Sequence, residues 1–158
     1  MQHDHIDWNQ YRDLCERLVA RVGASGWEFD SLLCLARGGM RPGDIFSRVY
    51  SKPLAIMTTS SYREAAGTVQ GDLDIAKYIT GVSELKGKLL LVDDLCDSGA
   101  TIKKVVEHLK RNYPQSTEIR VAVIWVKACS VVHPDFSCYQ YNDSLCIYPP
   151  LECYDDIG

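Results

Sequence analysis

The 158-residue sequence has no long hydrophobic run. Apolar stretches such as residues 89–92 and 121–126 are far shorter than the ~20 residues that a membrane-spanning helix needs. Residues 1–10 are polar and acidic, so they lack the apolar central region of a secretory signal. We therefore expect a cytoplasmic protein without an integral membrane segment.

Basic side chains are outnumbered, with 17 Lys and Arg against 21 Asp and Glu, for a formal net charge of −4. Proteins that bind nucleic acid usually carry an excess of positive charge, so we expect no nucleic-acid partner. A small phosphorylated ligand could still be held by one local group of residues. The motif Gly-x-x-x-x-Gly-Lys-Ser/Thr is also missing, which excludes a P-loop nucleotide hydrolase.

Paired cysteine motifs are missing too. The seven cysteines form no Cys-x-x-Cys pair, and His108 and His133 are isolated in the sequence. A zinc site needs clustered ligands, and a disulfide framework is typical of small secreted proteins. We favour reduced thiols that act as small hydrophobic residues over metal ligands or disulfides.

The composition, 46% hydrophobic and 24% charged, is typical of globular proteins, and the length suits one domain over residues 1–158. Buried strands are expected at residues 31–36, 54–58, 88–92 and 118–126. Helical spacing covers residues 8–22, 42–49 and 99–112, the first after an Asp7 to Gln10 capping box. This alternation predicts an α/β fold with a mainly parallel twisted sheet flanked by helices. We expect a further strand at residues 135–141 and an irregular tail at Pro149 and Pro150.

The segment with the clearest chemistry begins where a hydrophobic strand ends in Asp93 and Asp94. A short turn and a helix follow, with Asp97, Ser98, Gly99, Ala100 and Thr101 at the junction. Backbone N–H groups and hydroxyls at a helix N-terminus suit a phosphate. Two carboxylates would repel that phosphate unless they bind sugar hydroxyls or a cation such as Mg²⁺. The segment therefore predicts a site for a sugar phosphate with a metal.

A phosphorelay receiver domain also places an acidic pair after a strand. It needs an acceptor aspartate on a strand before the later lysine. Between residues 95 and 126 the carboxylates are Asp97, Glu107 and Glu118, and none follows an intervening strand. The receiver interpretation is therefore rejected.

Residues 89–101 resemble the phosphoribosyl-diphosphate signature of the type I phosphoribosyltransferases. Residues 35–43 resemble the pyrophosphate loop of the bacterial and archaeal xanthine-guanine and hypoxanthine branch. Ser60, Ser61 and Tyr62 resemble the start of that family's mobile catalytic loop, and Lys127 matches its purine-binding lysine. The resemblance extends from residue 8 to residue 155.

This resemblance implies transfer of a phosphoribosyl group from 5-phosphoribosyl 1-diphosphate to a 6-oxopurine in purine salvage, with Mg²⁺. The purine would be hypoxanthine, guanine or xanthine. It also implies a homo-oligomer (a dimer or tetramer) and a small C-terminal base-binding hood on the type I fold.

Residue roles follow from the same resemblance. Asp97 would be the catalytic base, and Asp93 and Asp94 would hold the ribose and the metal. The rest of the phosphoribosyl site would be Ser98, Gly99, Ala100 and Thr101. The pyrophosphate would be bound by Arg37, Gly38, Gly39 and Arg63. The purine base would be bound by Lys127, Cys146, Ile147 and Tyr148. The Ala36–Arg37 peptide would be cis, and residues 60–71 would form the mobile loop.

Two positions depart from the family pattern. Cys146 stands where the branch carries an aromatic residue, and Ala128 follows Lys127 in place of proline. The alternative hypothesis is a non-enzymatic regulatory protein that keeps the fold and binds nucleotide or nucleic acid. The negative net charge counts against binding nucleic acid.

Overall fold

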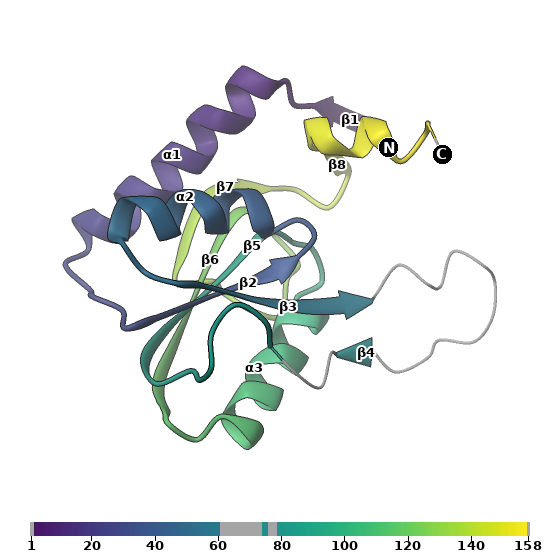
Figure 1. Ribbon diagram of the computed structural model, residues 1–158. Helices are drawn as coiled ribbons and strands as arrows, with labels where there is room; N and C mark the ends of the chain where they lie inside the picture. Colours follow the sequence, from purple (N-terminus) through teal and green to yellow (C-terminus); the bar gives the residue numbers. More distant parts are fainter. Residues whose placement is uncertain (1, 61–73, 76–78, 158) are drawn as a thin grey trace.

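The computed structural model describes residues 2–60, 74–75 and 79–157. Within these residues a six-stranded sheet has the order β4-β3-β2-β5-β6-β7 (Figure 1). Its strands are β2 (Ser31–Ala36), β3 (Leu54–Ser60), β4 (Asp74–Ile75), β5 (Gly87–Cys96), β6 (Ser116–Lys127) and β7 (Phe136–Tyr141). All neighbouring strands are parallel except β3 and β4. The predicted α/β fold is confirmed.

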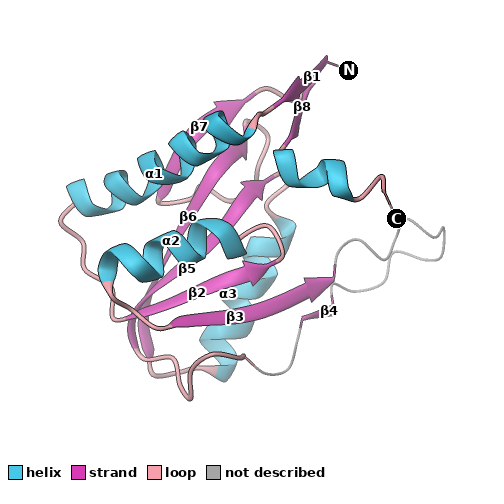
Figure 2. Ribbon diagram, turned by 45° about the horizontal axis from the view of Figure 1, so that its top comes forward, coloured by secondary structure: helices cyan, strands magenta, loops and turns pink. Residues whose placement is uncertain are grey.

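Helices cover both faces of this sheet. Helices α1 (Trp8–Ala24) and α2 (Met40–Tyr50) lie on one face, and α3 (Ala100–Asn112) lies on the other (Figure 2). Successive strand residues point to opposite faces, so Leu32 of β2 packs in the α1 and α2 core while Leu33 packs in the α3 core. Burial on both faces explains why the central strands are continuously hydrophobic.

Helix α1 begins at the predicted capping box. The N–H of Gln10 donates to Asp7 Oδ1 at 2.8 Å, and the N–H of Asp7 donates to Gln10 Oε1 at 2.9 Å. These two bonds satisfy backbone donors that the first turn of the helix leaves without partners.

The two ends of the chain meet in a second, two-stranded sheet. Strand β1 (Gln2–His5) runs parallel to β8 (Leu145–Tyr148), and the 3-10 helix η2 (Pro150–Tyr154) follows. The expected irregular tail is therefore wrong, because proline at the first helical position has a backbone angle that suits a helix start. Strand β1 was not predicted because its four residues are all exposed and show no hydrophobic alternation.

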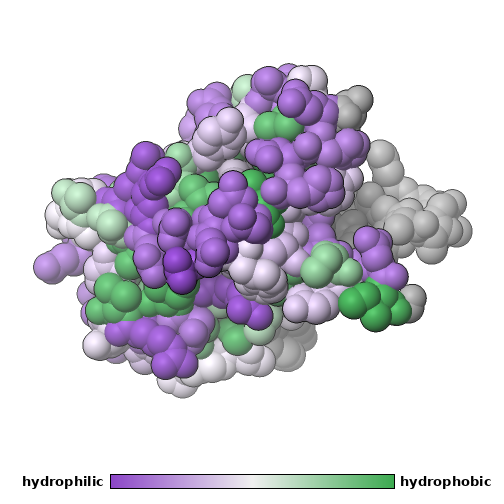
Figure 3. All heavy atoms as spheres, turned by 90° about the horizontal axis from the view of Figure 1, so that it is seen from above, coloured by the Kyte–Doolittle hydropathy of each residue, from purple (hydrophilic) through white to green (hydrophobic). Residues whose placement is uncertain are grey.

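The prediction that the cysteines act as small hydrophobic residues holds for three of them, since Cys15 and Cys34 are fully buried and Cys96 is 2% exposed. Cys129 and Cys153 are exposed instead. The face seen in Figure 3 is mainly hydrophilic, with apolar side chains in separate small areas. None of the described helices is both long enough and apolar enough to cross a membrane.

Candidate functional site

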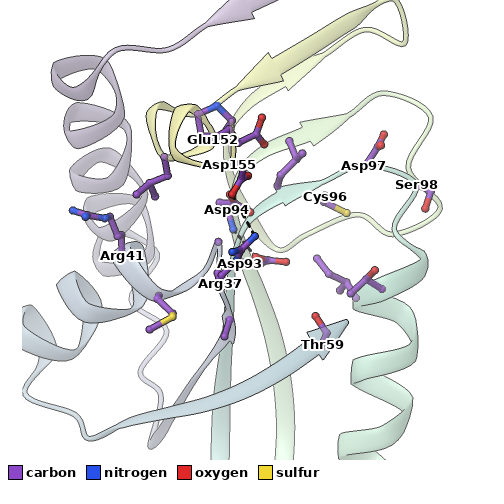
Figure 4. Close-up of a pocket in the computed structure, with 18 of the residues that line it drawn as sticks. Arg37, Arg41, Thr59, Asp93, Asp94, Cys96, Asp97, Ser98, Glu152 and Asp155 are labelled. Carbon is purple, nitrogen blue, oxygen red and sulfur yellow. Dashed lines mark hydrogen bonds and ion pairs between the residues drawn. The ribbon is translucent and has the colours of Figure 1, made fainter. Parts of the chain in front are cut away.

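A cavity of about 670 Å³ opens where β2, β3 and β5 end. Ligands of parallel α/β sheets bind at this edge, beyond the carboxyl ends of the strands. The predicted residues that line it are Arg37, Gly38, Asp93, Asp94, Asp97, Ser98, Gly99 and Thr101. Figure 4 shows Asp93 and Asp94 between the loop after β2 and the turn that carries Asp97 and Ser98. The structure thus brings the two predicted phosphate-binding segments to one cavity.

Strand β5 extends past the end of its pairing with β2. The register with β2 ends at Cys34 and Val92, whereas the register with β6 continues to Cys96 and Val126. Residues 93–96 therefore pair with β6 alone, and the edge of the strand that β2 no longer covers faces the cavity. The sequence predicted that this strand ends at residue 92, because Asp93 and Asp94 interrupt the apolar run.

The two glycines of the loop after β2 are required by close packing. A Cβ atom on Gly38 would lie 2.3 Å from Asp94 Oδ1, and one on Gly39 would lie 2.4 Å from the Val92 carbonyl oxygen. Neither position has room for a side chain. The Ala36–Arg37 peptide bond of this loop is cis, as predicted.

The two adjacent carboxylates sit in an unfavourable environment when both are charged. Burial, and then the neighbouring Asp94, raise the pKa of Asp93 well above its ordinary value, and burial raises the pKa of Asp94. The Asp94 N–H donates to Asp93 Oδ1 at 2.9 Å and only partly offsets the cost of ionising both carboxyl groups. A divalent cation would lower the remaining cost.

Mg²⁺ fits this pair of hard oxygen donors. It is commonly held by one or two carboxylates, with water and substrate phosphates completing its coordination. No group of three or more His, Cys, Asp or Glu side chains converges as a ready metal site in the part of the chain that the structure describes. A cation at Asp93 and Asp94 would therefore take its remaining ligands from water or a substrate.

The turn before α3 has the backbone form expected of a phosphate cradle. Gly99 has a φ of 86°, in the left-handed region that favours glycine, and it is the N-cap residue of α3. The Ala100 N–H donates to Ser98 Oγ at 3.2 Å, while Ala100 itself does not line the cavity. The N-terminus of α3 adds a partial positive charge at this point.

Lys127 ends β6 and forms an ion pair with Asp97. Its Nζ lies 3.0 Å from Asp97 Oδ1, and the hydrogen bond to that carboxylate raises the pKa of Lys127. Lys127 is beside the cavity rather than among its lining residues. Its role toward a purine stays a prediction.

The other predicted base-binding residues also lie away from the cavity lining. Ile147 is 6% exposed and belongs to the core next to α1. The ring of Tyr148 lies 5.2 Å from that of His3 and 5.0 Å from that of His5, on the two-stranded sheet. Neither these residues nor Cys146 line the cavity, and their base-binding role stays a prediction.

Sequence reasoning missed the contribution of η2 to the site. Its residues and their neighbours line the cavity through Pro149, Leu151, Glu152, Tyr154 and Asp155. Figure 4 shows Glu152 and Asp155 above Asp94, and Asp155 Oδ1 lies 3.7 Å from a guanidinium nitrogen of Arg37. Burial, and then Asp94, raise the pKa of Glu152. The available signal was the Pro149-Pro150 pair, which restricts the chain directly after β8.

Most of the predicted mobile loop lies outside the described residues. Ser60 is the last residue of β3, while Ser61, Tyr62 and Arg63 lie outside the described residues, as does most of the segment 60–71. Thr59, which precedes them on β3, is buried and lines the cavity.

A family model matches most of the chain. The family described as "Phosphoribosyl transferase domain" matches residues 7–148. This range contains the carboxylates of Asp93 and Asp94, the turn at residues 97–101, and the loop that holds Gly38 and Gly39.

Solved structures agree in fold. A purine phosphoribosyltransferase from Pyrococcus horikoshii Ot3 is 25% identical, with a TM-score of 0.78, and the match covers 95% of this chain and 94% of that one. A Helicobacter pylori xanthine-guanine-hypoxanthine phosphoribosyltransferase is 22% identical, with a TM-score of 0.76 and 92% of each chain covered. A Neisseria gonorrhoeae protein described as hypothetical, with bound ppGpp, is 18% identical, with a TM-score of 0.72 and coverage of 96% and 89%. At these last two identities the likeness shows the fold alone.

Proposed function

Because the chain belongs to the phosphoribosyl transferase domain family, we propose that it transfers the phosphoribosyl group of 5-phosphoribosyl 1-diphosphate to a 6-oxopurine and releases pyrophosphate. The observation that carries this proposal is the convergence of two segments on one cavity. Asp93 and Asp94 come from β5, and the glycine loop comes from the end of β2. Such a cavity suits a ligand with a sugar between two phosphate groups.

The turn from residue 97 to residue 101 would bind the 5-phosphate. Backbone N–H groups at the start of α3 and the hydroxyls of Ser98 and Thr101 are suited to that anion. The carboxylates of Asp93 and Asp94 would accept hydrogen bonds from the ribose hydroxyls. Mg²⁺ held at this pair would neutralise negative charge on the pyrophosphate group.

The loop after β2 would hold the departing pyrophosphate. Charge builds on this group as the bond to the ribose C1 breaks, so fixed donors at this place lower the barrier. Arg37 carries a positive charge at the cavity, and Gly38 and Gly39 let the backbone approach closely. Arg63 is proposed for the same role by resemblance.

The Lys127 and Asp97 pair supports the choice of a 6-oxopurine. A lysine ammonium has three donors and no acceptor, so it favours a 6-oxo group over the 6-amino group of adenine. A purine carbonyl at Lys127 would replace the Asp97 carboxylate, now 3.0 Å away, as its acceptor. Asp97 would then be available to accept the proton that the purine ring loses.

The experiment that tests this function is incubation with 5-phosphoribosyl 1-diphosphate, Mg²⁺ and one base at a time. Nucleoside monophosphate and pyrophosphate are quantified for hypoxanthine, guanine, xanthine, adenine and orotate. Equal amounts of both products with the three 6-oxopurines, and little with adenine, are expected. Asp94→Asn should abolish turnover, and Asp44→Asn, which alters a surface pair with Arg48 on α2, should not. Absence of product with every purine would reject the proposal.

A further inference from the structure

The chain between β6 and β7 packs against the turn at residues 97–101, which is proposed above to bind the 5-phosphate. This β6–β7 segment, residues 128–135, is joined to the turn by backbone and side-chain bonds. The Val131 N–H donates to the Ser98 carbonyl oxygen at 2.9 Å, and Ser130 Oγ lies 3.2 Å from Cys96 Sγ. The turn is therefore held on the side away from the cavity.

Ser130 is central to this contact. It is 6% exposed, and its hydroxyl donates to the Val132 carbonyl oxygen at 2.8 Å and accepts from the Val132 N–H at 3.2 Å. It is absent from the cavity lining, so it does not reach a ligand there. Any effect on binding must therefore act through its neighbours.

Gly99 presses directly against Ser130. A Cβ atom on Gly99 would lie 2.7 Å from Ser130 Oγ and 2.9 Å from the Val132 nitrogen. Gly99, the left-handed N-cap of α3, thus contacts both the Ser130 hydroxyl and the Val132 backbone that this hydroxyl binds. Movement of Ser130 would shift the residues from which α3 begins.

We propose that Ser130 is a positioning residue for the phosphoribosyl site, which rests on the function proposed above. Its hydroxyl fixes the β6–β7 segment against Cys96 and Gly99, and so holds the turn in the form that presents its N–H groups to a phosphate. Preformed donors bind an anion without the cost of ordering the loop. Lys127, in contrast, is fixed by its own place on β6, whose register with β5 reaches Val126.

The test compares Ser130→Ala with wild-type protein in equilibrium binding and in steady-state kinetics. The variant must order the turn when it binds, so we expect about a tenfold rise in Kd, or about 1.4 kcal/mol, for 5-phosphoribosyl 1-diphosphate with Mg²⁺, measured by calorimetry. KM for this substrate should rise by the same factor, while KM for the purine and kcat stay within about twofold.

Ser25→Ala is the matched control. The Ser25 hydroxyl donates to the Val22 carbonyl oxygen at 2.6 Å at the end of α1, away from the cavity lining. A comparable loss of stability without change in either KM is expected. If Ser130→Ala does not fold, Ser130→Cys keeps a γ atom, with a longer bond to Cβ and a weaker hydrogen bond, and should also raise this Kd.

An unchanged Kd in a folded Ser130 variant would overturn the inference, as would equal increases in both KM values. Failure of the proposed function is a different result. A wild-type protein that binds 5-phosphoribosyl 1-diphosphate but transfers nothing refutes the transferase activity, and the Kd comparison still decides the role of Ser130. A wild-type protein that does not bind it refutes both.

Discussion

The ammonium group of Lys127 lies 3.0 Å from Asp97 Oδ1 and joins the end of β6 to the turn before α3. The Lys127 side chain is 19% exposed, whereas that of Asp97 is 63% exposed and lines the cavity. Asp97 thus connects Lys127, which is not among the lining residues, to the cavity. A ligand that brings its own acceptor can take the place of the carboxylate.

The first prediction concerns the chemical step. Asp97→Asn should lower kcat by about 10²–10⁴-fold, because a positioned general base contributes this much. KM for 5-phosphoribosyl 1-diphosphate should change little, since asparagine keeps the size of the side chain. Steady-state kinetics with hypoxanthine or guanine measure both constants.

Asp143→Asn is the matched control for this variant. Asp143 also acts electrostatically on Lys127, and its Oδ1 accepts from the Cys129 N–H at 3.2 Å, but it does not line the cavity. Its replacement should leave kcat nearly unchanged. If kcat for Asp97→Asn equals that of the wild type, Asp97 is not the base.

The second prediction concerns the choice of base. Lys127→Ala should reduce kcat/KM for 6-oxopurines by about 10–100-fold, the effect of losing a hydrogen bond to a charged group. The kcat/KM for adenine, which offers no acceptor at this position, should fall less, so the preference for 6-oxopurines over adenine should decrease. Lys110→Ala, in the last turn of α3, is the control for loss of a lysine. An unaltered ratio between guanine and adenine would remove Lys127 from base recognition.

The third prediction is a conflict between stability and function at Asp93. Its folded pKa is raised above its ordinary value of 3.8, so the folded state binds more protons than the unfolded state between these two values. The free energy of unfolding must therefore fall as the pH rises through this window. Asp93→Asn removes the contribution of Asp93 to this dependence, while Asp94, whose pKa is also raised, keeps its own. The variant should be more stable at pH 7.5 without Mg²⁺ by about 1–2 kcal/mol.

Urea unfolding at pH 4.5 and 7.5 measures the effect, and the advantage of Asp93→Asn should grow with pH. The same variant should lose most of its transferase activity, because Asp93 is proposed to bind the ribose and Mg²⁺. Asp44→Asn, on the surface of α2, should change neither property. A less stable Asp93→Asn protein at pH 7.5 would contradict the assigned cause of the pKa shift.

The sequence predicted the sheet and its helices because their signals are local. The apolar run of β2, the capping box of α1 and the small-residue turn at Gly99 each specify structure within a few residues. The cavity contribution of η2 and the pairing of β1 with β8 depend on contacts between the two ends of the chain. Short exposed strands have no hydrophobic periodicity, so the sequence pattern does not predict them. The ion pair of Lys127 and Asp97 was not predicted either, because it joins residues from different elements.

The last prediction concerns thiol reactivity. Burial raises the pKa of Cys15 and of Cys34 to about 12, so about one thiol in 10⁴ is ionised at pH 8, and only the thiolate reacts with an alkylating agent. Cys129 and Cys153 are exposed and should be modified by iodoacetamide in the folded protein. Nearby Asp143 raises the pKa of Cys129, which should slow its reaction.

Peptide mass spectrometry before and after unfolding in urea gives the rate at each position. Cys15 and Cys34 should react only after unfolding, which serves as the control that their peptides are detected. Bound purine should slow modification of Cys129, two residues beyond Lys127, and leave Cys153 less affected. Labelling of Cys34 in the folded protein as fast as that of Cys153 would show that the core between β2 and α2 opens readily. Cysteine modification rates would then not measure the exposure of residues near the site.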